Sequence, residues 1–517
     1  MRTIRLLAVT AAAVEALRPT LVPRTTRHQA MVTAACAATA GLVAGVAPDI
    51  PSRHARWLLP AGVVVGVLRG TAHARAQRRS YPEWDPRPQN PVLASAAGVA
   101  AGLTLAAGPG VAYRGVVKAG AALSSRHGGS AAAWSSRVAA TVGGGLAGAS
   151  VIGARSALGA LREIGTAADY ALRQPPDDPH VTGGPGSPVD YDTLARDGRR
   201  FVSLRTPADQ IRTVTSTAIE PLRVYVGLQS ADTVEARVGI AMAELERLGA
   251  FSRRTVLIMS PAGSGYAEYV AAEAVECFTA GDCASVVVQY GVLPSMLSLD
   301  RVGLGARTVR ALLDRILERV ALMDTPPLVI MYGESLGARV AQEALALAPS
   351  LESDGIVSGI DALLSVGTPG GPSMRNDLRY NPNVVHLDRW QQLTGQDSAQ
   401  LWFLDHDADP VTRWDGALAW RYPAWLRRPR GRNIPDGMAW LPVLTWWQVI
   451  FDLVFAAQQQ SGQFRSRGHD YRADLAPVLA AVLGVRADVP AVAGLLARRE
   501  VQRDSLLAEQ TASSLPH

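Results

Sequence analysis

VIMYGESLGARV, residues 329–340, joins a strand-length apolar run to the start of a helix through a turn that holds one serine between two glycines. A serine hydroxyl is a weak nucleophile, so a catalytic serine must lie on a sharp turn that a base can reach. Gly333 and Gly337 lack the Cβ atoms that would collide where strand passes into helix. We interpret the segment as a nucleophile elbow carrying Ser335. The alternative is a structural turn, or a chance match among 48 glycines.

The pattern around the elbow predicts an α/β domain over residues 191–517. Apolar runs rich in Val, Ile and Leu alternate with segments of helical spacing, which indicates a parallel sheet covered on both faces. Strands are expected at 222–226, 255–259, 285–290, 328–332, 362–366 and 401–404, and helices at 234–248, 266–277, 309–323 and 475–483. The expected fold class is therefore a doubly wound, mainly parallel α/β sheet.

The order of residues along the chain indicates which histidine could be the general base. In α/β-hydrolases the triad follows the order nucleophile, acid, base, so the histidine must come after Ser335 and after the acid. Five of the nine histidines precede the elbow, and His517 is terminal. Of the three that remain, His469 has both a strand-end acid before it and a helical pattern after it. We therefore expect His469 to be the general base.

The acid is expected at the end of the strand 401–404, where Asp405-His406-Asp407-Ala408-Asp409-Pro410 follows. A carboxylate there would accept a hydrogen bond from the imidazole Nδ1 and stabilise the imidazolium. We favour Asp409, because it lies just past the strand and Pro410 stiffens the loop. Asp405 and Asp407 remain alternatives.

Two backbone N–H groups should bind the developing oxyanion. One is expected from Leu336, directly after the nucleophile. The other is expected in the glycine-containing turn after the strand 255–259, near Gly263 or Ser264. An ordinary strand-to-helix turn is the alternative interpretation of this loop.

The first 173 residues have a different composition, which predicts an all-α transmembrane region. Segments at 31–48, 57–67, 92–111 and 134–152 are rich in Ala, Val, Leu and Gly and nearly free of charge. A packed soluble bundle is the alternative. If the chain crosses the membrane four times, the distribution of arginines between its loops predicts a C-terminal domain in the cytoplasm. A fifth span at 4–17 would instead place that domain outside the cell. We expect a multi-pass protein of the cell membrane, and the Pro- and Gly-rich residues 174–190 as a linker.

The composition argues against several other classes of protein, including nucleic-acid-binding and metal-binding proteins. The net charge is +6, but Lys118 is the only lysine, so the abundance of Arg reflects codon bias rather than a nucleic-acid surface, and no nucleic-acid motif accompanies it. Residues 277 and 283 are cysteines close enough to bridge, although separate thiols are favoured. No metal-ligand pattern is present, so no metal or cofactor is expected.

An aromatic-rich insertion separates the acid from the base. Eight of the 11 Trp lie between residues 390 and 447, and an apolar helical run follows at 441–457. Aromatic rings beside Arg427, Arg428, Arg430 and Arg432 suit a membrane interface with anionic headgroups. One hypothesis is a cap over residues 412–460 that accepts an acyl chain; core packing of the aromatic rings is the alternative.

Taken together, these segments resemble a bacterial family of membrane-anchored α/β-hydrolases with a transmembrane helical N-terminal region. The resemblance is carried by residues 18–24 (RPTLVPR), 221–228 (PLRVYVGL), 260–266 (SPAGSGY), 289–295 (QYGVLPS), 333–337 (GESLG), 406–410 (HDADP) and 468–469 (GH). It implies a Ser-Asp-His triad on Ser335, Asp409 and His469. The 260–266 loop departs from the TPTGTGW form of the family, and the first apolar segment is weaker than the family's first span.

The sequence predicts a membrane-bound serine hydrolase that cleaves an acyl ester or thioester, with membrane lipids as partners and a lipid-like substrate. An acyltransferase using the same triad is the nearest alternative, because an alcohol can replace water in deacylation. A membrane scaffold that retains the hydrolase fold without catalysis belongs to a different class. The ordered presence of all three triad residue types argues against the scaffold.

Overall fold

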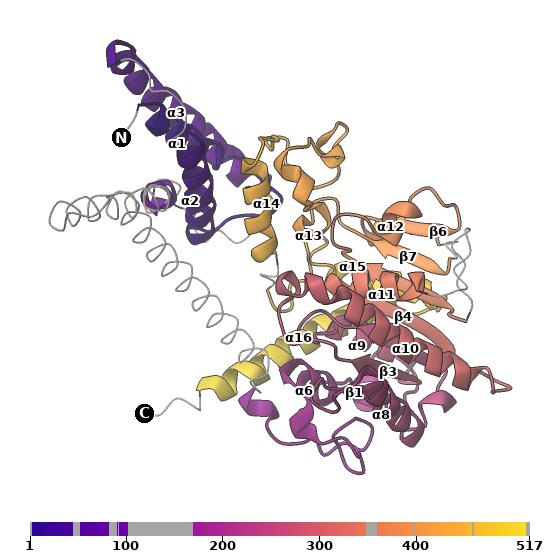
Figure 1. Ribbon diagram of the computed structural model, residues 1–517. Helices are drawn as coiled ribbons and strands as arrows, with labels where there is room; N and C mark the ends of the chain where they lie inside the picture. The colour runs from indigo at the N-terminus through magenta and orange to yellow at the C-terminus, as the bar shows by residue number, and fades with distance from the viewer. Residues whose placement is uncertain are drawn as a thin grey trace, which may run out of the picture. The chain divides into compact units, whose positions relative to one another are not determined.

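The protein is described here from a computed structural model, which places residues 3–44, 52–81, 90, 93–101, 169–347, 359–395, 399–456 and 460–512. The chain divides into two compact units (Figure 1). The hydrolase unit comprises residues 160–413 and 457–517, and the N-terminal unit comprises residues 1–159 and 414–456.

The hydrolase unit is built on a seven-stranded sheet in the order β1-β3-β2-β4-β5-β7-β6, with every neighbouring pair parallel. The strands are β1 (Leu222–Val226), β2 (Thr255–Ser260), β3 (Cys283–Val288), β4 (Leu328–Glu334), β5 (Ala362–Val366), β6 (Val384–Leu387) and β7 (Leu401–Leu404). Five of them are buried along their whole length, as expected for strands whose apolar runs face helices on both sides. The predicted doubly wound α/β sheet is confirmed.

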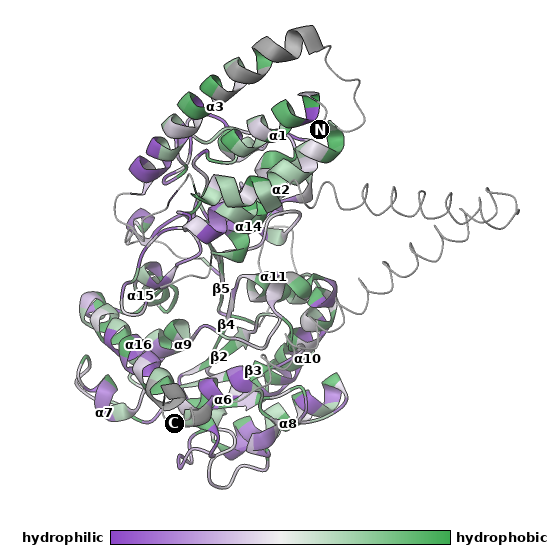
Figure 2. Ribbon diagram, turned by 90° about the vertical axis from the view of Figure 1, so that its left-hand side faces the viewer, coloured by the Kyte–Doolittle hydropathy of each residue, from purple (hydrophilic) through white to green (hydrophobic). Residues whose placement is uncertain are grey.

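Helices cover both faces of this sheet (Figure 2). One face packs against α6 (Arg196–Ser203), α9 (Tyr269–Phe278), α15 (Arg472–Val482) and α16 (Val489–Ala512). The other packs against α8 (Val234–Arg247), α10 (Val302–Val320) and α11 (Leu336–Ala346). The remaining short helices are α7 (Ala208–Ile211), α12 (Met374–Asp377) and α13 (Pro410–Arg413). Because all strands run in the same direction, the loops that follow β2, β4, β5 and β7 lie together at the carboxyl end of the sheet.

Residues 174–190, expected as a linker, form an ordered loop against β1. The N–H of Thr182 donates to the carbonyl of Arg223, and the N–H of Arg223 donates to the carbonyl of His180. Val181 is fully buried beside that strand. The Pro and Gly composition thus produces a loop, and its backbone hydrogen bonds tie it to the hydrolase unit.

The N-terminal unit joins two distant parts of the sequence. Its helices are α1 (Thr3–Glu15), α2 (Thr26–Val43), α3 (Ser52–Ser80) and, from the insertion, α14 (Leu444–Val454). Asp452 of α14 is fully buried and accepts hydrogen bonds from the N–H of Leu21, at 3.0 Å, and from Nε of Arg24, at 3.2 Å. Because a buried charge requires a partner, this pair holds α14 against the N-terminal helices.

The Trp-rich insertion therefore packs within the N-terminal unit. Trp447 donates from its ring nitrogen to Oγ1 of Thr39 at 3.0 Å, and Trp446 meets Trp447 edge-on with ring centroids 4.8 Å apart. Phe455 stacks on His28 at 4.1 Å. These contacts favour the core-packing interpretation for part of the aromatic set, while the cap over the active site stays a prediction.

The expected transmembrane helices are not found in the described part of the chain, where no helix combines the length and hydropathy needed to cross a bilayer. The reason lies in their composition. Helix α2 has 18 residues, half of them Ala or Thr, and α3 carries arginines at both ends of its apolar middle. The expected span 134–152, and most of 92–111, lie outside the described residues.

Candidate active site

Ser335 occupies the turn between β4 and α11 with a backbone φ of 55° and ψ of −124°. A positive φ is uncommon for a residue with a side chain, and such strain concentrates at functional sites. The N–H of Ser335 donates to the carbonyl of Val366, the last residue of β5, at 2.9 Å. This bond fixes the strained turn against the neighbouring strand.

The two glycines of the turn lie where no Cβ fits. A Cβ on Gly337 would stand 2.2 Å from the carbonyl oxygen of Ser260, and one on Gly333 would stand 2.5 Å from the carbonyl oxygen of Gly337. Strand, turn and helix therefore approach as closely as the sequence pattern predicted. The first of these contacts also places the end of β2 directly against the elbow.

His469 and Asp409 form a hydrogen-bonded pair. Nδ1 of the imidazole donates to Oδ2 of Asp409 at 2.8 Å, and the carboxylate is fully buried while 11% of the histidine side chain is exposed. Oδ1 of Asp409 accepts from the N–H of Val411 at 2.8 Å. The carboxylate is thus held from two sides, and the bond leaves Nε2 of His469 as the nitrogen that can accept a proton.

The base lies at the same edge of the sheet as the elbow. A Cβ on Gly367 would stand 2.9 Å from Cε1 of His469, so the imidazole packs on the residue that follows β5. The residue before it, Val366, binds the N–H of Ser335. Ser335 and His469 therefore both lie at the carboxyl end of β5.

The two alternative acids bind other groups. Asp405 accepts from the N–H of Thr368 at 2.7 Å and pairs with Arg375 at 3.0 Å. Asp407 pairs with Arg413 at 3.0 Å. Asp409 is the carboxylate that the structure brings to Nδ1 of His469.

Electrostatics favour the protonated imidazole. Burial lowers the pKa of His469, but the charge of Asp409, the hydrogen bond that His469 donates to Asp409 and the charges of Glu334 and Asp470 outweigh it and raise the pKa to about 9. The same environment that makes His469 a strong base therefore stabilises the imidazolium that forms when the base takes a proton.

The loop after β2 is where the second oxyanion donor is expected. The N–H groups of Ala262, Gly265 and Tyr266 are bound within the loop. In the described part of the chain, the N–H groups of Gly263 and Ser264 have no acceptor. Leu336 is the first residue of α11, a position whose N–H has no partner within the helix.

Other side chains hold this loop in place. Oγ of Ser264 donates to Asp197 at 2.7 Å, and Nε2 of Gln289 donates to the carbonyls of Ser264 and Gly291, each at 2.8 Å. A Cβ on Gly263 would stand 2.4 Å from Oγ of Ser298. Close packing therefore requires glycine at position 263, and these hydrogen bonds hold the loop in place.

Comparison with known proteins agrees with this geometry. Residues 222–492, more than half of the chain, match a family described as an alpha/beta-hydrolase family, and residues 17–205 match the N-terminal region of such a family. The chain belongs to this alpha/beta-hydrolase family. No curated protein and no solved structure shows significant similarity to it.

Sequence reasoning did not identify Tyr471 of this hydrolase. Its hydroxyl donates to Oδ2 of Asp409 at 2.7 Å and accepts from the N–H of His406 at 3.0 Å. The tyrosine therefore shares the carboxylate oxygen that holds the base. Its position two residues after His469 is the sequence feature that could have indicated a role near the candidate base.

His406, set aside as a base, supports the loop that carries His469. Its Nδ1 lies 2.9 Å from the carbonyl oxygen of Gly468 and its Nε2 lies 3.0 Å from Oδ2 of Asp474. The ring also stacks on Tyr471 with centroids 4.0 Å apart. One buried imidazole therefore holds the residue before His469 and packs on the tyrosine two residues after it.

Within the described residues, no cluster of His, Cys, Asp and Glu has the form of a metal site. Cys277 and Cys283 are both buried and unbridged, so the separate-thiol alternative fits.

Proposed function

We propose that this hydrolase cleaves an acyl ester or thioester through an acyl-enzyme on Ser335. The observation that carries the proposal is the meeting of a strained serine elbow with a buried His469–Asp409 hydrogen bond at one edge of the sheet. A loop with two N–H groups free to bind an oxyanion lies beside the same elbow. This combination matches what acyl transfer needs.

The chemistry follows from the geometry. Nε2 of His469 takes the proton of Ser335 while Oγ attacks the acyl carbonyl, and Asp409 stabilises the imidazolium. The N–H of Leu336 with that of Gly263 or Ser264 binds the oxyanion. The leaving group takes the proton from His469, and water, activated by the same imidazole, then releases the acid. An alcohol in place of water would make the enzyme an acyltransferase.

Labelling with a fluorescent fluorophosphonate tests the proposal. Wild-type full-length protein should be labelled, and Ser335→Ala should not. Ser252→Ala is the matched control, because Ser252 is exposed next to the amino end of β2, at the opposite end of the strand from the site. If folded wild-type protein stays unlabelled, the non-catalytic scaffold becomes the better explanation. An acyl acceptor that changes the product from free acid to a new ester would identify a transferase.

The labelling rate should depend on pH. The neutral imidazole is the base, and the pKa of His469 is raised to about 9, so the reactive fraction falls tenfold per pH unit below that value. The rate constant should therefore rise from pH 6 to 8, reach half its maximum near pH 9, and level off only above that pH. We would measure it by gel fluorescence, with hydrolysis of the probe itself recorded at each pH. A midpoint near 6.5, the usual value for histidine, would contradict the assigned environment.

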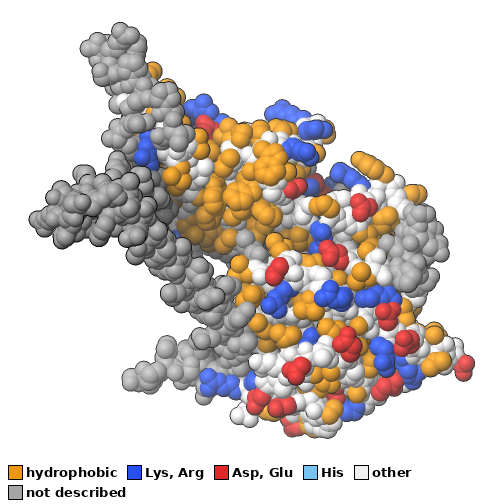
Figure 3. All heavy atoms as spheres, in the orientation of Figure 1, with side chains coloured by type: hydrophobic (Ala, Val, Ile, Leu, Met, Phe, Trp, Pro, Cys, Tyr) orange, Lys and Arg blue, Asp and Glu red, His pale blue; other side chains and the backbone are white. Residues whose placement is uncertain are grey.

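We further propose a lipid-like substrate and a membrane location, supported by the surface of the N-terminal unit. Helices α2 and α3 expose several large apolar side chains, between 53% and 65% for Leu42, Val64, Val65, Val67 and Leu68. Figure 3 shows hydrophobic side chains gathered over α2 and α14. Soluble proteins rarely expose apolar side chains in such groups unless the surface binds a partner or a membrane.

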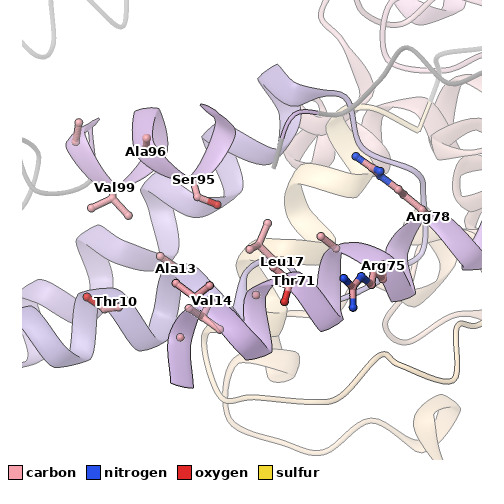
Figure 4. A pocket seen from close by; sticks show the side chains of 15 residues that line it. Thr10, Ala13, Val14, Leu17, Thr71, Arg75, Arg78, Ser95, Ala96 and Val99 are labelled. Carbon is pink, nitrogen blue, oxygen red and sulfur yellow. The ribbon is translucent and has the colours of Figure 1, made fainter. Parts of the chain in front are cut away.

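An apolar pocket in the same unit supports the lipid assignment. Its volume is about 740 Å³, and its walls come from α1, α3 and the helical residues 93–101 (Figure 4). Val14, Leu17 and Val67 line it, and Arg75 and Arg78 stand together toward one end. This arrangement suits an acyl chain with an anionic group.

Membrane association can be measured by carbonate extraction of membranes from cells that express the full chain. Wild type should stay in the membrane pellet. Replacing both Val67 and Leu68 by Ser should move more of the protein into the extract, because each change removes apolar area from an exposed face. Leu322→Ser is the control, since Leu322 is 83% exposed but lies in the hydrolase unit. Equal extraction of all three proteins would count against the α3 face as a membrane contact.

A further inference from the structure

The hydroxyl of Tyr471 makes two hydrogen bonds that the triad itself does not require. It donates to Oδ2 of Asp409 at 2.7 Å and accepts from the N–H of His406 at 3.0 Å. Tyr471 is only 1% exposed, so water does not compete for either bond. A tyrosine hydroxyl carries a single proton, and the N–H of His406 already occupies its acceptor side. That proton is therefore directed at Asp409.

The ring of Tyr471 is fixed by packing as well as by its hydroxyl. His406 stacks on it with centroids 4.0 Å apart, and His469 meets it edge-on at 5.7 Å and 85°. A Cβ on Gly367 would stand 2.8 Å from Cε2 of the ring, so the residue that follows β5 packs on a third side. These neighbours aim the hydroxyl at the carboxylate, and a phenylalanine ring would fit the same space.

One carboxylate oxygen accepts two protons at this site. Oδ2 of Asp409 lies 2.8 Å from Nδ1 of His469 and 2.7 Å from the hydroxyl of Tyr471, while Oδ1 accepts from the N–H of Val411 at 2.8 Å. Asp409 is fully buried, so protein groups stabilise its negative charge in place of water. A hydrogen bond that stabilises a carboxylate also makes that carboxylate a weaker acceptor for a second donor.

We propose that Tyr471 is a positioning residue that shares Oδ2 of Asp409 with His469 and so limits how tightly the carboxylate holds the imidazolium. Tyr471 acts through Asp409 and His469, so this inference rests on the proposed function. Asp409 still fixes the tautomer of the imidazole, but the tyrosine binds part of its charge. His469 then releases its proton to the leaving group more readily than it would beside an unshared carboxylate.

The ionisation of the tyrosine supports this role. Burial raises the pKa of Tyr471 well above its ordinary value, and the charges of Asp409 and Asp405 raise it further. The hydroxyl therefore remains a neutral donor across the pH range in which His469 titrates, around pH 9. A tyrosinate would instead add a negative charge and would have no proton to donate.

Other charged groups also face the two rings. They lie on β4, after β7, on α13 and directly after the base: Glu334, Asp405, Arg413 and Asp470. His406, which stacks on Tyr471, lies 3.0 Å from the carboxylate of Asp474 on α15. Removal of the hydroxyl alone leaves each of these groups in the chain, so a change at His469 reports the shared oxygen.

The first measurement is the downfield proton resonance of Nδ1 of His469, in full-length protein labelled with ¹⁵N-histidine. The resonance is assigned by its absence in His469→Gln. Tyr471→Phe should move it further downfield, because Oδ2 of Asp409 loses its second donor and the hydrogen bond from His469 becomes stronger. This signal does not depend on any reaction at Ser335. An unchanged resonance would overturn the proposal.

The second measurement is the pH profile of fluorophosphonate labelling. Without the hydroxyl, Asp409 holds the imidazolium more tightly, so the midpoint near pH 9 should move to higher pH. We expect a shift of roughly half a unit to one unit, because hydrogen bonds to charged groups are stronger than those between neutral groups. A merely structural role would lower the rate at every pH and leave the midpoint in place, and that result would also contradict the proposal.

Incorporation of 3-fluorotyrosine at position 471 tests the opposite direction. Fluorine withdraws electron density from the ring and makes the hydroxyl a stronger donor, while the ring keeps its shape and both hydrogen bonds. The resonance of His469 should therefore move upfield and the labelling midpoint should move to lower pH. This variant also keeps the proposal testable if Tyr471→Phe does not fold. A shift in the same direction as that of phenylalanine would show that shape, and not the hydrogen bond, affects the base.

Tyr225→Phe is the matched control. The hydroxyl of Tyr225 is also fully buried, and it donates to the carbonyl of Gly265 in the loop after β2 at 3.0 Å. Its loss should change the maximal labelling rate through that loop and leave both the resonance and the midpoint in place. Shifts equal to those of Tyr471→Phe would show that the loss of any buried hydroxyl affects the base, and the specific role of Tyr471 would fail.

The two measurements separate this inference from the proposed function. If the resonance of His469 responds as described but Ser335 is never labelled, the role of Tyr471 in holding the imidazole stands and the hydrolase function fails. If Ser335 is labelled but neither the resonance nor the midpoint responds, the hydrolase function stands and the role of Tyr471 fails.

Discussion

Asp409→Asn should lower the rate of acylation by Ser335 roughly 10⁴-fold while leaving the fold intact. Oδ2 of Asp409 accepts hydrogen bonds from both His469, at 2.8 Å, and the hydroxyl of Tyr471, at 2.7 Å. An asparagine amide offers N–H groups where one of these donors needs an acceptor. The imidazole then takes the other tautomer, and Nε2 carries a proton when it should accept one.

Asp407→Asn is the matched control, because Asp407 lies two residues away and pairs with Arg413. Its labelling rate should stay within a few-fold of wild type. Both variants would be compared by time courses of fluorophosphonate labelling at pH 8, with circular dichroism to verify folding. A larger loss in Asp407→Asn than in Asp409→Asn would assign the acid to the other carboxylate.

Gly337→Ala should destabilise the hydrolase unit by at least about 3 kcal/mol, the upper end of the usual range for overpacking. The added Cβ would stand 2.2 Å from the carbonyl oxygen of Ser260. That oxygen belongs to the backbone of β2 and cannot rotate away as a side chain would. Either β2 or α11 must shift, and the elbow shifts with it, so labelling of Ser335 should disappear as well.

Gly239→Ala provides the comparison for this change. Gly239 is exposed on α8, and a Cβ there would meet nothing within 4 Å. Alanine favours helix over glycine by about 0.8–1.0 kcal/mol, so this variant should be neutral or slightly stabilised. Urea denaturation followed by circular dichroism would measure both. A Gly337→Ala midpoint equal to that of wild type would show that the strand and helix are less tightly packed than the structure indicates.

The sheet could be predicted from local patterns because its strands are buried on both faces. The predicted strands at 222–226, 362–366 and 401–404 have those bounds in the structure. Strand β6 was missed, because it is a four-residue edge strand with one middle position partly buried and the other exposed. A short strand of mixed burial gives no continuous apolar run from which it could be recognised.

The candidate triad could be named from residue type and chain order, since strand ends and a glycine-flanked serine are local features. The side chains that hold the candidate triad in place could not be predicted in this way. The hydrogen bond between Tyr471 and Asp409 spans 62 residues, and the contact of His406 with Asp474 spans 68. Such pairings depend on how loops after different strands meet in space.

The packing of the Trp-rich insertion could not be predicted for a related reason. Asp452 and Arg24 are 428 residues apart, and no periodic pattern links them. Apolar composition and arginines in the insertion indicated a membrane interface or a cap. The contacts with α2 became visible only when both segments were placed in the same unit.

The ion pair between Arg24 and Asp452 also sets an order of events during synthesis. At about 5–20 residues per second, a ribosome needs roughly 20–90 s to add the 428 residues that separate them. Throughout that interval the nascent N-terminal helices lack the carboxylate that neutralises Arg24, so they cannot reach their final packing. A gene fragment that stops before codon 452 should yield an N-terminal region that is degraded or held by chaperones, and supplying residues 414–456 as a separate chain should rescue it.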